Sequence, residues 1–416
     1  MKRIFYSLLL LFLLLPFLSW GQVDIVTGAE VLMSRPNAYW SQLEGRRVGV
    51  VANQTSVLGP QKTHLVDTLV GQGIAVKAIF CPEHGFRGQA EAGASVASDT
   101  DSRTGIPVVS LYGKTKKPTH EQLQDIDIVV FDLQDVGCRF YTYISTLSYV
   151  MEACAENGVP LMVLDRPNPN AHYVDGPVLE PQYQSFVGLH PVPVVYGMTI
   201  GEYAKMVLGE HWLWMTQQHN QWVRAKDYLQ AVKGFKLTVV PLQNYTHHSR
   251  YVLPVAPSPN LQTPQAVALY PSLCLLEGAN VSVGRGTDNP FEIVGSPKYV
   301  PSKSTISTRT VITFTPHRIK GVSENPPFKG QQCYGLDLRR APVPAKFDIA
   351  YIQELHNNTP KYEFFLANHF FDKLAGTATL RLQLDMNMTE AAIRQSWAPN
   401  LDKFKKIRQK YLLYPE

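Results

Sequence analysis

The fold of this chain can be predicted from residues 126–131, Ile-Asp-Ile-Val-Val-Phe, and from Asp132, which follows them. The run is short, β-branched and almost wholly apolar, which is typical of a strand covered on both faces of a parallel sheet. Similar runs lie at residues 48–51, 74–80, 106–111 and 159–164. Between them, apolar residues follow helical spacing at residues 64–69 and 143–154. This alternation predicts an α/β fold with a doubly wound, mostly parallel sheet.

The second half of the chain has a different pattern. Prolines interrupt it at positions 254, 257, 259, 264, 271, 290 and 297. Helical patterns return at residues 347–355, 364–374 and 389–396, while residues 377–384 alternate as a strand does. We therefore expect an N-terminal α/β domain at residues 22–245 and a smaller C-terminal α+β domain at residues 246–416.

Composition excludes several classes of protein. The chain has 416 residues, of which 45% are hydrophobic and 18% charged, so a disordered chain is not expected. The net charge of +5 comes from 39 Lys and Arg against 34 Asp and Glu, without long runs of either sign, so nucleic acid is not an expected partner. The five cysteines are odd in number and form no C-x-x-C pair. They are expected to be small core residues and not a disulfide framework.

Residues 1–21 have the pattern of a signal peptide. A positive start, Met1-Lys2-Arg3, precedes an apolar run at residues 8–15, and Ser19-Trp20-Gly21 supplies small residues near a cleavage site before Gln22. The pattern predicts export across the inner membrane to the periplasm or beyond, with no stable membrane insertion after cleavage. An uncleaved anchor is the alternative, although the apolar run is short for a membrane span.

Cofactor and metal motifs are missing from the sequence. The turn after the first predicted strand reads Ala52-Asn53-Gln54-Thr55, without the glycines of a dinucleotide-binding loop. The sequence also lacks a P-loop, a G-x-S-x-G elbow and an H-E-x-x-H helix. We therefore expect no cofactor and no metal.

Polar residues follow all five predicted strands. The carboxyl ends of parallel strands meet at one edge, where open α/β sheets bind ligands, so the set predicts one polar cleft. The alternative is that these residues are turn formers and helix caps. The residues are Asn53, Glu83 with His84, Tyr112, Asp132 with Asp135, and Asp165 with Arg166.

Glu83 is the best candidate for a general acid. It lies in the stretch Pro82-Glu83-His84-Gly85-Phe86-Arg87-Gly88, where apolar neighbours can raise the pKa of a carboxyl group. Arg87 or His84 could orient Glu83 or hold substrate, and a Glu83–Arg87 salt bridge that pins the loop is the alternative. Carboxylates, amides, tyrosines and arginines without a cofactor motif suit a carbohydrate site, and glycoside hydrolysis usually needs two carboxyl groups.

The sequence resembles the NamZ-type exo-β-N-acetylmuramidases along nearly its whole mature length. In the first half the matching stretches are residues 49–55, Gly-Val-Val-Ala-Asn-Gln-Thr; 82–88, quoted above; 131–137, Phe-Asp-Leu-Gln-Asp-Val-Gly; and 164–169, Leu-Asp-Arg-Pro-Asn-Pro. In the second half they are residues 257–260, Pro-Ser-Pro-Asn; 276–280, Leu-Glu-Gly-Ala-Asn; 283–287, Val-Gly-Arg-Gly-Thr; 290–292, Pro-Phe-Glu; and 411–414, Tyr-Leu-Leu-Tyr. The chain departs from the family at Ala279, where Thr is usual, and at Val283, where Glu is frequent.

The resemblance implies a glycosidase that releases N-acetylmuramic acid from the non-reducing ends of peptidoglycan fragments. It also implies a Rossmann-like domain joined to a smaller domain, with the active-site cleft between them. The family's catalytic glutamate falls on Glu83. We expect Asp132 or Glu277 to assist it, as nucleophile, as base, or by polarising the substrate's own acetamido group.

Recognition of the substrate is expected to involve its lactyl carboxylate. A helix N-terminus after Gly137, with Arg139, Arg166 or Arg285 nearby, would bind that anion. The expected substrate-binding residues are Asn53, His84, Arg87, Arg139, Tyr143, Asp165, Arg166, Asn260, Asn280, Arg285 and Glu292.

Two other functions suit the same cleft. One is a non-catalytic protein that binds cell-wall sugars, and the other is a metal-assisted esterase or deacetylase that uses His84 and Asp132. The sequence leaves the oligomeric state open.

Overall fold

A central seven-stranded sheet organises the N-terminal half of this computed structural model, which describes residues 24–34, 36–83, 85–87, 99–113, 115–301 and 310–416. The strands follow the order β11-β8-β7-β1-β4-β6-β5, and all are parallel except β5, which runs antiparallel to β6. All five predicted strands are confirmed, and β11 is a sixth parallel strand that was not predicted from the sequence. Their bounds are β1 Arg47–Ala52, β4 Ala75–Cys81, β5 Asp99–Thr100, β6 Pro107–Ser110, β7 Ile128–Asp132, β8 Leu161–Leu164 and β11 Leu237–Val240.

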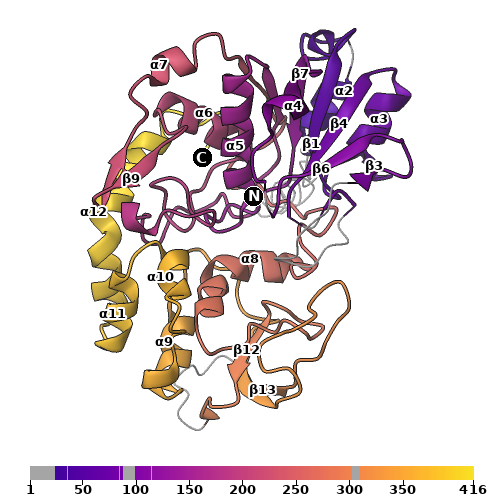
Figure 1. The fold of residues 1–416 in the computed structure, drawn as a ribbon. Helices are drawn as coiled ribbons and strands as arrows, with labels where there is room; N and C mark the ends of the chain where they lie inside the picture. The colour runs from indigo at the N-terminus through magenta and orange to yellow at the C-terminus, as the bar shows by residue number, and fades with distance from the viewer. Residues whose placement is uncertain (1–23, 35, 84, 88–98, 114, 302–309) are drawn as a thin grey trace, which may run out of the picture.

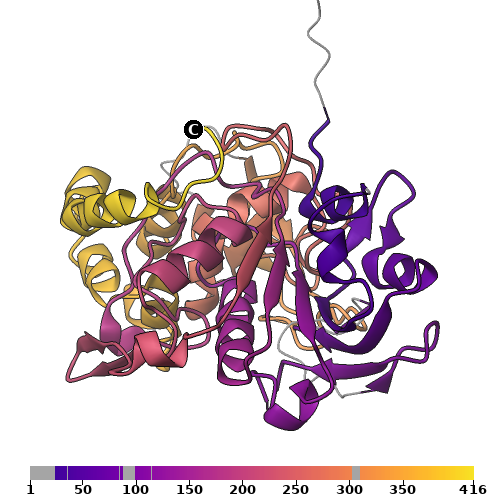
Figure 2. The same cartoon turned by 90° about the horizontal axis from the view of Figure 1, so that it is seen from above.

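The sheet is doubly wound. From β1 the chain extends the sheet through β4 to β6, then returns to place β7, β8 and β11 on the other side of β1. The strand order therefore reverses between β1 and β7, the point where open α/β sheets form their ligand crevice. Figure 2 shows helices on both faces of the sheet. In this half they are α2 Gly28–Met33, α3 Leu65–Gly71, α4 His120–Leu123, α5 Tyr143–Glu156, α6 Ile200–Gly209 and α7 Tyr228–Ala231.

Alternate strand residues belong to two different cores. Val50 and Val130 pack with α2 and α3 in one cluster, whereas Val51 and Val129 pack with α5 and α6 in another. This two-sided burial explains why the strands read as continuous apolar runs. The α5 side is also continuous with the core of the C-terminal half.

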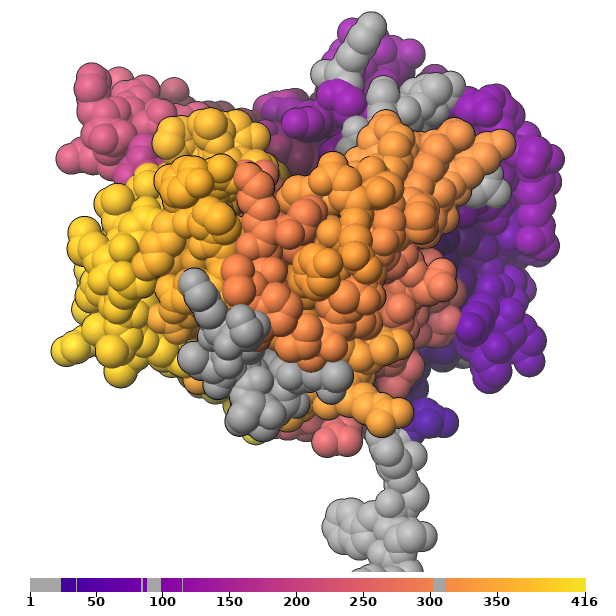
Figure 3. Space-filling view, turned by 90° about the horizontal axis from the view of Figure 1, so that it is seen from below, coloured from indigo at the N-terminus to yellow at the C-terminus, as the bar shows by residue number. Residues whose placement is uncertain are grey.

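The C-terminal half packs below the sheet-containing half, with α8 between them (Figure 1). It contains a three-stranded antiparallel sheet of order β12-β14-β13 and a group of helices. Seen from below, this half covers most of the visible surface (Figure 3). The elements are α8 Pro264–Leu273, the 3-10 helix Cys274–Gly278, β12 Ile293–Ser296, β13 Thr310–Phe314, β14 Cys333–Asp337, α9 Ala350–Asn357, α10 Phe370–Ala375, α11 Thr379–Asp385 and α12 Glu390–Arg408. Two short hairpins, β2 Val57–Leu58 with β3 Thr63–His64 and β9 Thr216–Gln218 with β10 Gln221–Val223, complete the fold.

The prediction of a strand at residues 377–384 is wrong, because residues 379–384 lie in helix α11. Leu380, Leu382 and Leu384 alternate in sequence, which suggested a strand. In the structure Leu380 and Leu384 are buried on one side of the helix, while Leu382 is 45% exposed on the other. Leucine has no preference for strands, so three alternating leucines also suit a helix with buried residues at i and i+4.

The end of the chain returns to the N-terminal half. The Arg408 guanidinium, at the end of α12, donates hydrogen bonds to the Gly197 carbonyl oxygen at 2.9 and 2.7 Å. Figure 1 shows α12 along one side of the molecule, beside both halves. The boundary at residue 245 therefore stays a prediction, since the last residues of the chain rejoin the first half.

Two further observations concern the chain as a whole. All five cysteines are buried and free, as predicted. Among the residues that the structure describes, no helix is long and apolar enough to cross a membrane. The predicted signal peptide lies outside the described residues.

Candidate active site

Glu83 lies directly after β4, at the carboxyl edge of the sheet. The chain turns here through Gly85, whose φ of 73° favours glycine. Thr142, the N-cap residue of α5, directs its hydroxyl at Glu83 Oε2 at 3.5 Å. On another side, burial, the Glu83 charge and a hydrogen bond to that carboxylate raise the pKa of Tyr112 to about 12. Glu83 is thus held by side chains from the chain segments that follow β6 and β7.

Two tyrosines continue the wall beside Glu83. The rings of Tyr141 and Tyr143 meet edge to face, with their centroids 4.6 Å apart. The Tyr143 hydroxyl accepts a hydrogen bond from Asn53 Nδ2 at 2.7 Å, and the Tyr141 hydroxyl donates one to the Pro257 carbonyl oxygen at 2.7 Å. Burial raises the pKa of both tyrosines, so both hydroxyls stay protonated. Asn53, which follows β1, therefore holds Tyr143 in place beside Glu83.

The C-terminal half contributes an arginine held by a carboxylate. Arg285 Nε donates to Glu277 Oε1 at 2.5 Å, and its guanidinium lies 5.1 Å from the centroid of the Phe291 ring. Burial by itself would lower the pKa of Arg285, but the charge and hydrogen bond of Glu277 outweigh it and raise that pKa. Gly284 and Gly286 flank Arg285 with φ of 80° each, which only glycine adopts readily, so the loop shape depends on both.

Glu83, the two tyrosines and Arg285 line one small cavity of about 60 Å³. This is well below the range of about 300–1,000 Å³ that is usual for small-ligand sites, so the cavity suits one part of a substrate. The cavity draws residues from both halves of the chain. Its lining is Glu83, Phe140, Tyr141, Thr142, Tyr143, Ser258, Leu261, Tyr270, Arg285 and Phe291.

Asp132 and Arg166 form a buried ion pair away from this lining. Asp132 Oδ1 accepts from Arg166 Nε at 2.6 Å, and Oδ2 accepts from Nη2 at 2.8 Å. The two side chains are 0% and 1% exposed. Burial lowers the pKa of Arg166, yet the Asp132 charge and bonds outweigh it and raise that pKa. Both predicted residues therefore lie inside the protein, and both carboxylate oxygens of Asp132 are already bonded to Arg166.

Asp165 is also buried, and it anchors the end of the chain. It accepts hydrogen bonds from the Tyr414 hydroxyl at 2.5 Å, the Thr199 hydroxyl at 2.7 Å and the Gly201 backbone at 2.8 Å. Burial raises the pKa of Asp165 to about 7. The predicted residue at the end of β8 thus lies in a network with the C-terminus.

Arg139 joins the two halves. Its guanidinium donates to the carbonyl oxygens of Pro177, Val192 and Leu374, each at 2.8 Å. Burial lowers the pKa of Arg139 to about 10. The helix predicted from the spacing of residues 143–154 is confirmed as α5, which begins at Tyr143, and its N-cap residue Thr142 faces Glu83.

The remaining predicted residues are spread over the molecule. Arg87 pairs with Asp101 at 3.0 Å and with Asp67 at 3.4 Å, so these ion pairs stabilise the loop that follows β4. Asn260 donates to Val322, Asn280 donates to Glu363, and Glu292 accepts from Thr263. None of these residues lines the cavity, and His84 lies outside the described residues.

Several residues of the cavity were not among the predicted site residues. Tyr141 stands two residues from the predicted Tyr143, and Thr142 lies between them. Ser258 and Phe291 lie in stretches that match the family but were given no role there, and Tyr270 left no recognisable signal. Within the described part of the chain, no group of three potential ligands could hold a metal ion.

Comparisons with known proteins cover almost the entire chain. The family described as exo-beta-N-acetylmuramidase NamZ, N-terminal, matches residues 48–265, and its C-terminal counterpart matches residues 268–414. A relative from Bacillus subtilis (strain 168), named peptidoglycan beta-N-acetylmuramidase NamZ, is 39% identical over 401 residues, which cover 94% of this chain and 91% of that protein.

Two solved structures of DUF1343 family proteins from Bacteroides fragilis NCTC 9343 have the same fold. One has a TM-score of 0.79 and 37% sequence identity, and the other has 0.76 and 30%. Each comparison covers 94% of this chain and 99% of the other. None of these relatives is named as a sugar-binding protein or an esterase.

Proposed function

This chain belongs to the NamZ family of exo-β-N-acetylmuramidases, and we propose that it acts as a glycosidase that releases N-acetylmuramic acid from the ends of peptidoglycan fragments. The observation that carries the catalytic assignment is the cavity in which Glu83 and Arg285 meet from opposite halves. A carboxyl group and a cation in one enclosed site are what an anionic glycoside needs for bond cleavage and recognition.

Glu83 is the general acid. It donates its proton to the oxygen of the leaving group while the glycosidic bond breaks; water then adds to the anomeric carbon and gives up a proton that restores the Glu83 carboxyl group. Thr142 and Tyr112 hold its carboxyl group at the cavity. The neighbouring tyrosines supply a wall with an apolar character, and their neutral hydroxyls are already bonded to Asn53 and Pro257.

Arg285 recognises the lactyl carboxylate that distinguishes muramic acid from glucosamine. Its Nε is bonded to Glu277, which leaves the two Nη groups as donors for a second carboxylate. The other two candidate arginines suit this role less, because Arg139 bonds three carbonyl groups and Arg166 is paired with Asp132. Glu277 is accordingly a positioning residue that orients Arg285.

Export is part of the proposal. The pattern at residues 1–21 supports removal of a signal peptide, which would bring the enzyme to the compartment that holds peptidoglycan. Sequencing the N-terminus of protein recovered from the periplasm or medium checks this, with a start at Gln22 expected. A full-length chain retained in the cytoplasm contradicts it.

The catalytic assignment is tested with a chromogenic N-acetylmuramic acid glycoside. Glu83→Gln should lower turnover by about 10²–10⁴-fold, the usual contribution of a general acid, and leave the circular dichroism spectrum unchanged. The matched control is Glu121→Gln, an exposed glutamate on α4, which should keep normal turnover. Near-normal turnover in Glu83→Gln would refute the assignment.

The recognition step has its own test. Arg285→Gln should raise KM for the muramic acid glycoside and leave KM for the matching N-acetylglucosamine glycoside little changed. If KM rises equally for both substrates, Arg285 does not recognise the lactyl carboxylate.

A further inference from the structure

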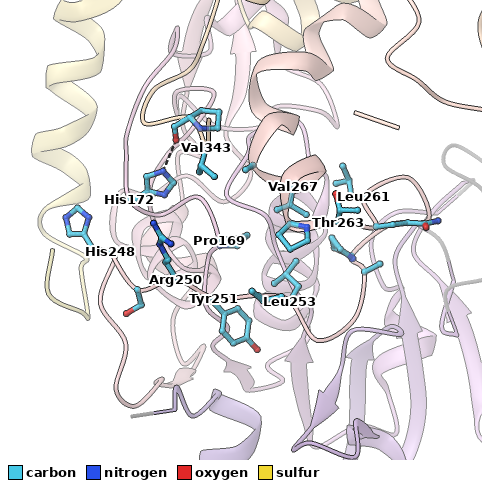
Figure 4. A pocket seen from close by; sticks show the side chains of 18 of the residues that line it. Pro169, His172, His248, Arg250, Tyr251, Leu253, Leu261, Thr263, Val267 and Val343 are labelled. Carbon is cyan, nitrogen blue, oxygen red and sulfur yellow. Dashed lines mark hydrogen bonds between the residues drawn. The ribbon is translucent and has the colours of Figure 1, made fainter. Parts of the chain in front are cut away.

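A second, much larger cavity lies on the segment that joins the two halves. Its volume is about 520 Å³, within the range of about 300–1,000 Å³ that is usual for small-ligand sites. The segment at residues 248–264 forms one side, and residues 343–345 form another. Figure 4 shows this cavity from close by.

This cavity is distinct from the one that holds Glu83. Leu261 lines both, and it is only 2% exposed, so it stands between them as a partition. Pro257 lines the larger cavity, while its carbonyl oxygen accepts a hydrogen bond from Tyr141 on the other side.

The lining has two unlike ends. In the view of Figure 4, His172, His248 and Arg250 lie on one side of the cavity, whereas Leu253, Leu261 and Val267 lie on the other. The His172 Nε2 is hydrogen-bonded to the Pro344 carbonyl oxygen at 3.0 Å, so Arg250 is the cation open to a ligand. No Asp or Glu is among the residues that line the cavity. Within the described residues, no carboxylate is within ion-pair distance of the Arg250 guanidinium. A ligand with an apolar body and one negative end would match this distribution of charge.

One amide group on the apolar side is suited to a peptide N–H. The Gln262 side chain is exposed at the cavity, and its Nε2 donates to the Pro259 carbonyl oxygen at 2.8 Å, which leaves its Oε1 as an acceptor. The Thr263 hydroxyl is already bonded to Glu292 and to the Ala266 backbone nitrogen. The rim is apolar as well, since Val252 is 69% exposed and Val343 is 64% exposed. Small apolar side chains joined by amides, with a carboxylate at the end, satisfy all three features at once.

We propose that this cavity binds a short apolar peptide through its free C-terminal carboxylate. The carboxylate meets the Arg250 guanidinium, and the peptide's side chains lie against Leu253 and Val267. The site is separate from the catalytic pocket, and it does not depend on the muramidase assignment.

The test uses acetyl-trialanine and its C-terminal amide as a matched pair of probes. Ligand-observed NMR titration of the full-length enzyme, up to about 10 mM of each peptide, measures the affinity. The acid should bind, and the amide should bind at least about fivefold more weakly, the value of one partly exposed ion pair. No binding of the acid, or equal binding of acid and amide, overturns the proposal.

Variants locate the binding. Arg250→Gln should weaken the binding of acetyl-trialanine about as much as amidation of the peptide does. Arg46 is an exposed arginine of the N-terminal half, and Arg46→Gln should leave this binding unchanged. Ala268→Trp, from α8, and Val343→Trp, from the rim, should each abolish binding by filling the space. Val343 is exposed, so its variant remains informative if Ala268→Trp fails to fold. Unchanged binding in folded Val343→Trp and Arg250→Gln would overturn the proposal.

Muramidase turnover serves as a separate readout. Neither Ala268 nor Val343 lines the cavity of Glu83, so both variants should keep turnover while they lose the peptide. Failure of peptide binding with normal turnover refutes this site alone, and loss of turnover in Glu83→Gln bears only on the catalytic assignment.

Discussion

Replacing Arg166 by Met tests whether the buried pair of Asp132 and Arg166 is structural. The two side chains share hydrogen bonds of 2.6 and 2.8 Å and are almost completely buried. In Arg166→Met, Asp132 keeps its charge inside the protein without a partner. Breaking a buried pair in this way costs about 3–5 kcal/mol.

The expected change in unfolding temperature follows from the size of the chain. At about 2.1 cal/mol/K for each residue, 416 residues have an unfolding entropy of about 0.9 kcal/mol/K. A loss of about 3–5 kcal/mol therefore lowers Tm by about 3–6 °C. Urea unfolding, followed by both tryptophan fluorescence and far-ultraviolet circular dichroism, measures the free energy if the two transitions coincide.

The double variant separates a structural pair from a catalytic one. Asp132→Leu with Arg166→Met removes both charges and should recover most of the stability, because a buried ion pair is often no more stable than apolar residues of similar volume. The double-mutant cycle should give a coupling free energy of about 2–3 kcal/mol. The folded double variant should also hydrolyse the muramic acid glycoside.

The control is an ion pair at the surface. Arg47 pairs with Asp127 at 2.8 Å, but the side chains are 43% and 37% exposed and the pair is screened by solvent, so Arg47→Met should lower the urea midpoint much less than Arg166→Met does. The reasoning is refuted if Arg166→Met costs no more than Arg47→Met. Loss of turnover in a folded double variant would instead assign Asp132 or Arg166 to the chemistry.

Three further changes test other parts of the structure. Tyr143→Phe leaves the buried Asn53 amide without its acceptor, so unfolding in urea should show a loss of about 1–3 kcal/mol, and an unchanged midpoint would contradict the hydrogen bond. Gly278→Ala would put a Cβ 2.2 Å from the Phe371 backbone nitrogen, so the urea midpoint should reveal a loss of about 1–3 kcal/mol or more, whereas a neutral change would show that α10 can move. Burial raises the pKa of Asp165 from 3.8 to about 7, so the folded state binds more protons than the unfolded state and stability falls as pH rises from about 4 to 7. Asp165→Asn should flatten the slope of Tm against pH, and an unaltered slope would refute the raised pKa.

The sequence predicted the N-terminal half better than the C-terminal half. Strands buried on both faces leave long apolar runs, and five of the six parallel strands were found in this way. The missed strand, β11, is at the edge of the sheet, and its residues Leu237–Val239 are only half-buried, so its pattern is weaker. In the C-terminal half, α11 was taken for a strand because three alternating leucines fit either period.

The candidate site was predicted in part. Glu83 and Tyr143 could be found because a strand end and a helix start each leave a local pattern, and Arg285 was found through the family resemblance. Polar residues at the other strand ends were expected in the same cleft, but Asp132, Arg166 and Asp165 bond within the protein. A strand end shows where a side chain starts, and its partners decide where its polar atoms point.

By itself the sequence determined the doubly wound sheet, the position of Glu83 at its carboxyl edge and the free, buried cysteines. These features depend on periodicity and on residue type, which are local properties of the chain. Tertiary structure alone decided that Glu83 shares a cavity with Arg285, that Glu277 holds this arginine, and that a second cavity opens on the joining segment. Glu83 and Arg285 stand about 200 positions apart, and only packing of the two halves against each other brings such a pair together.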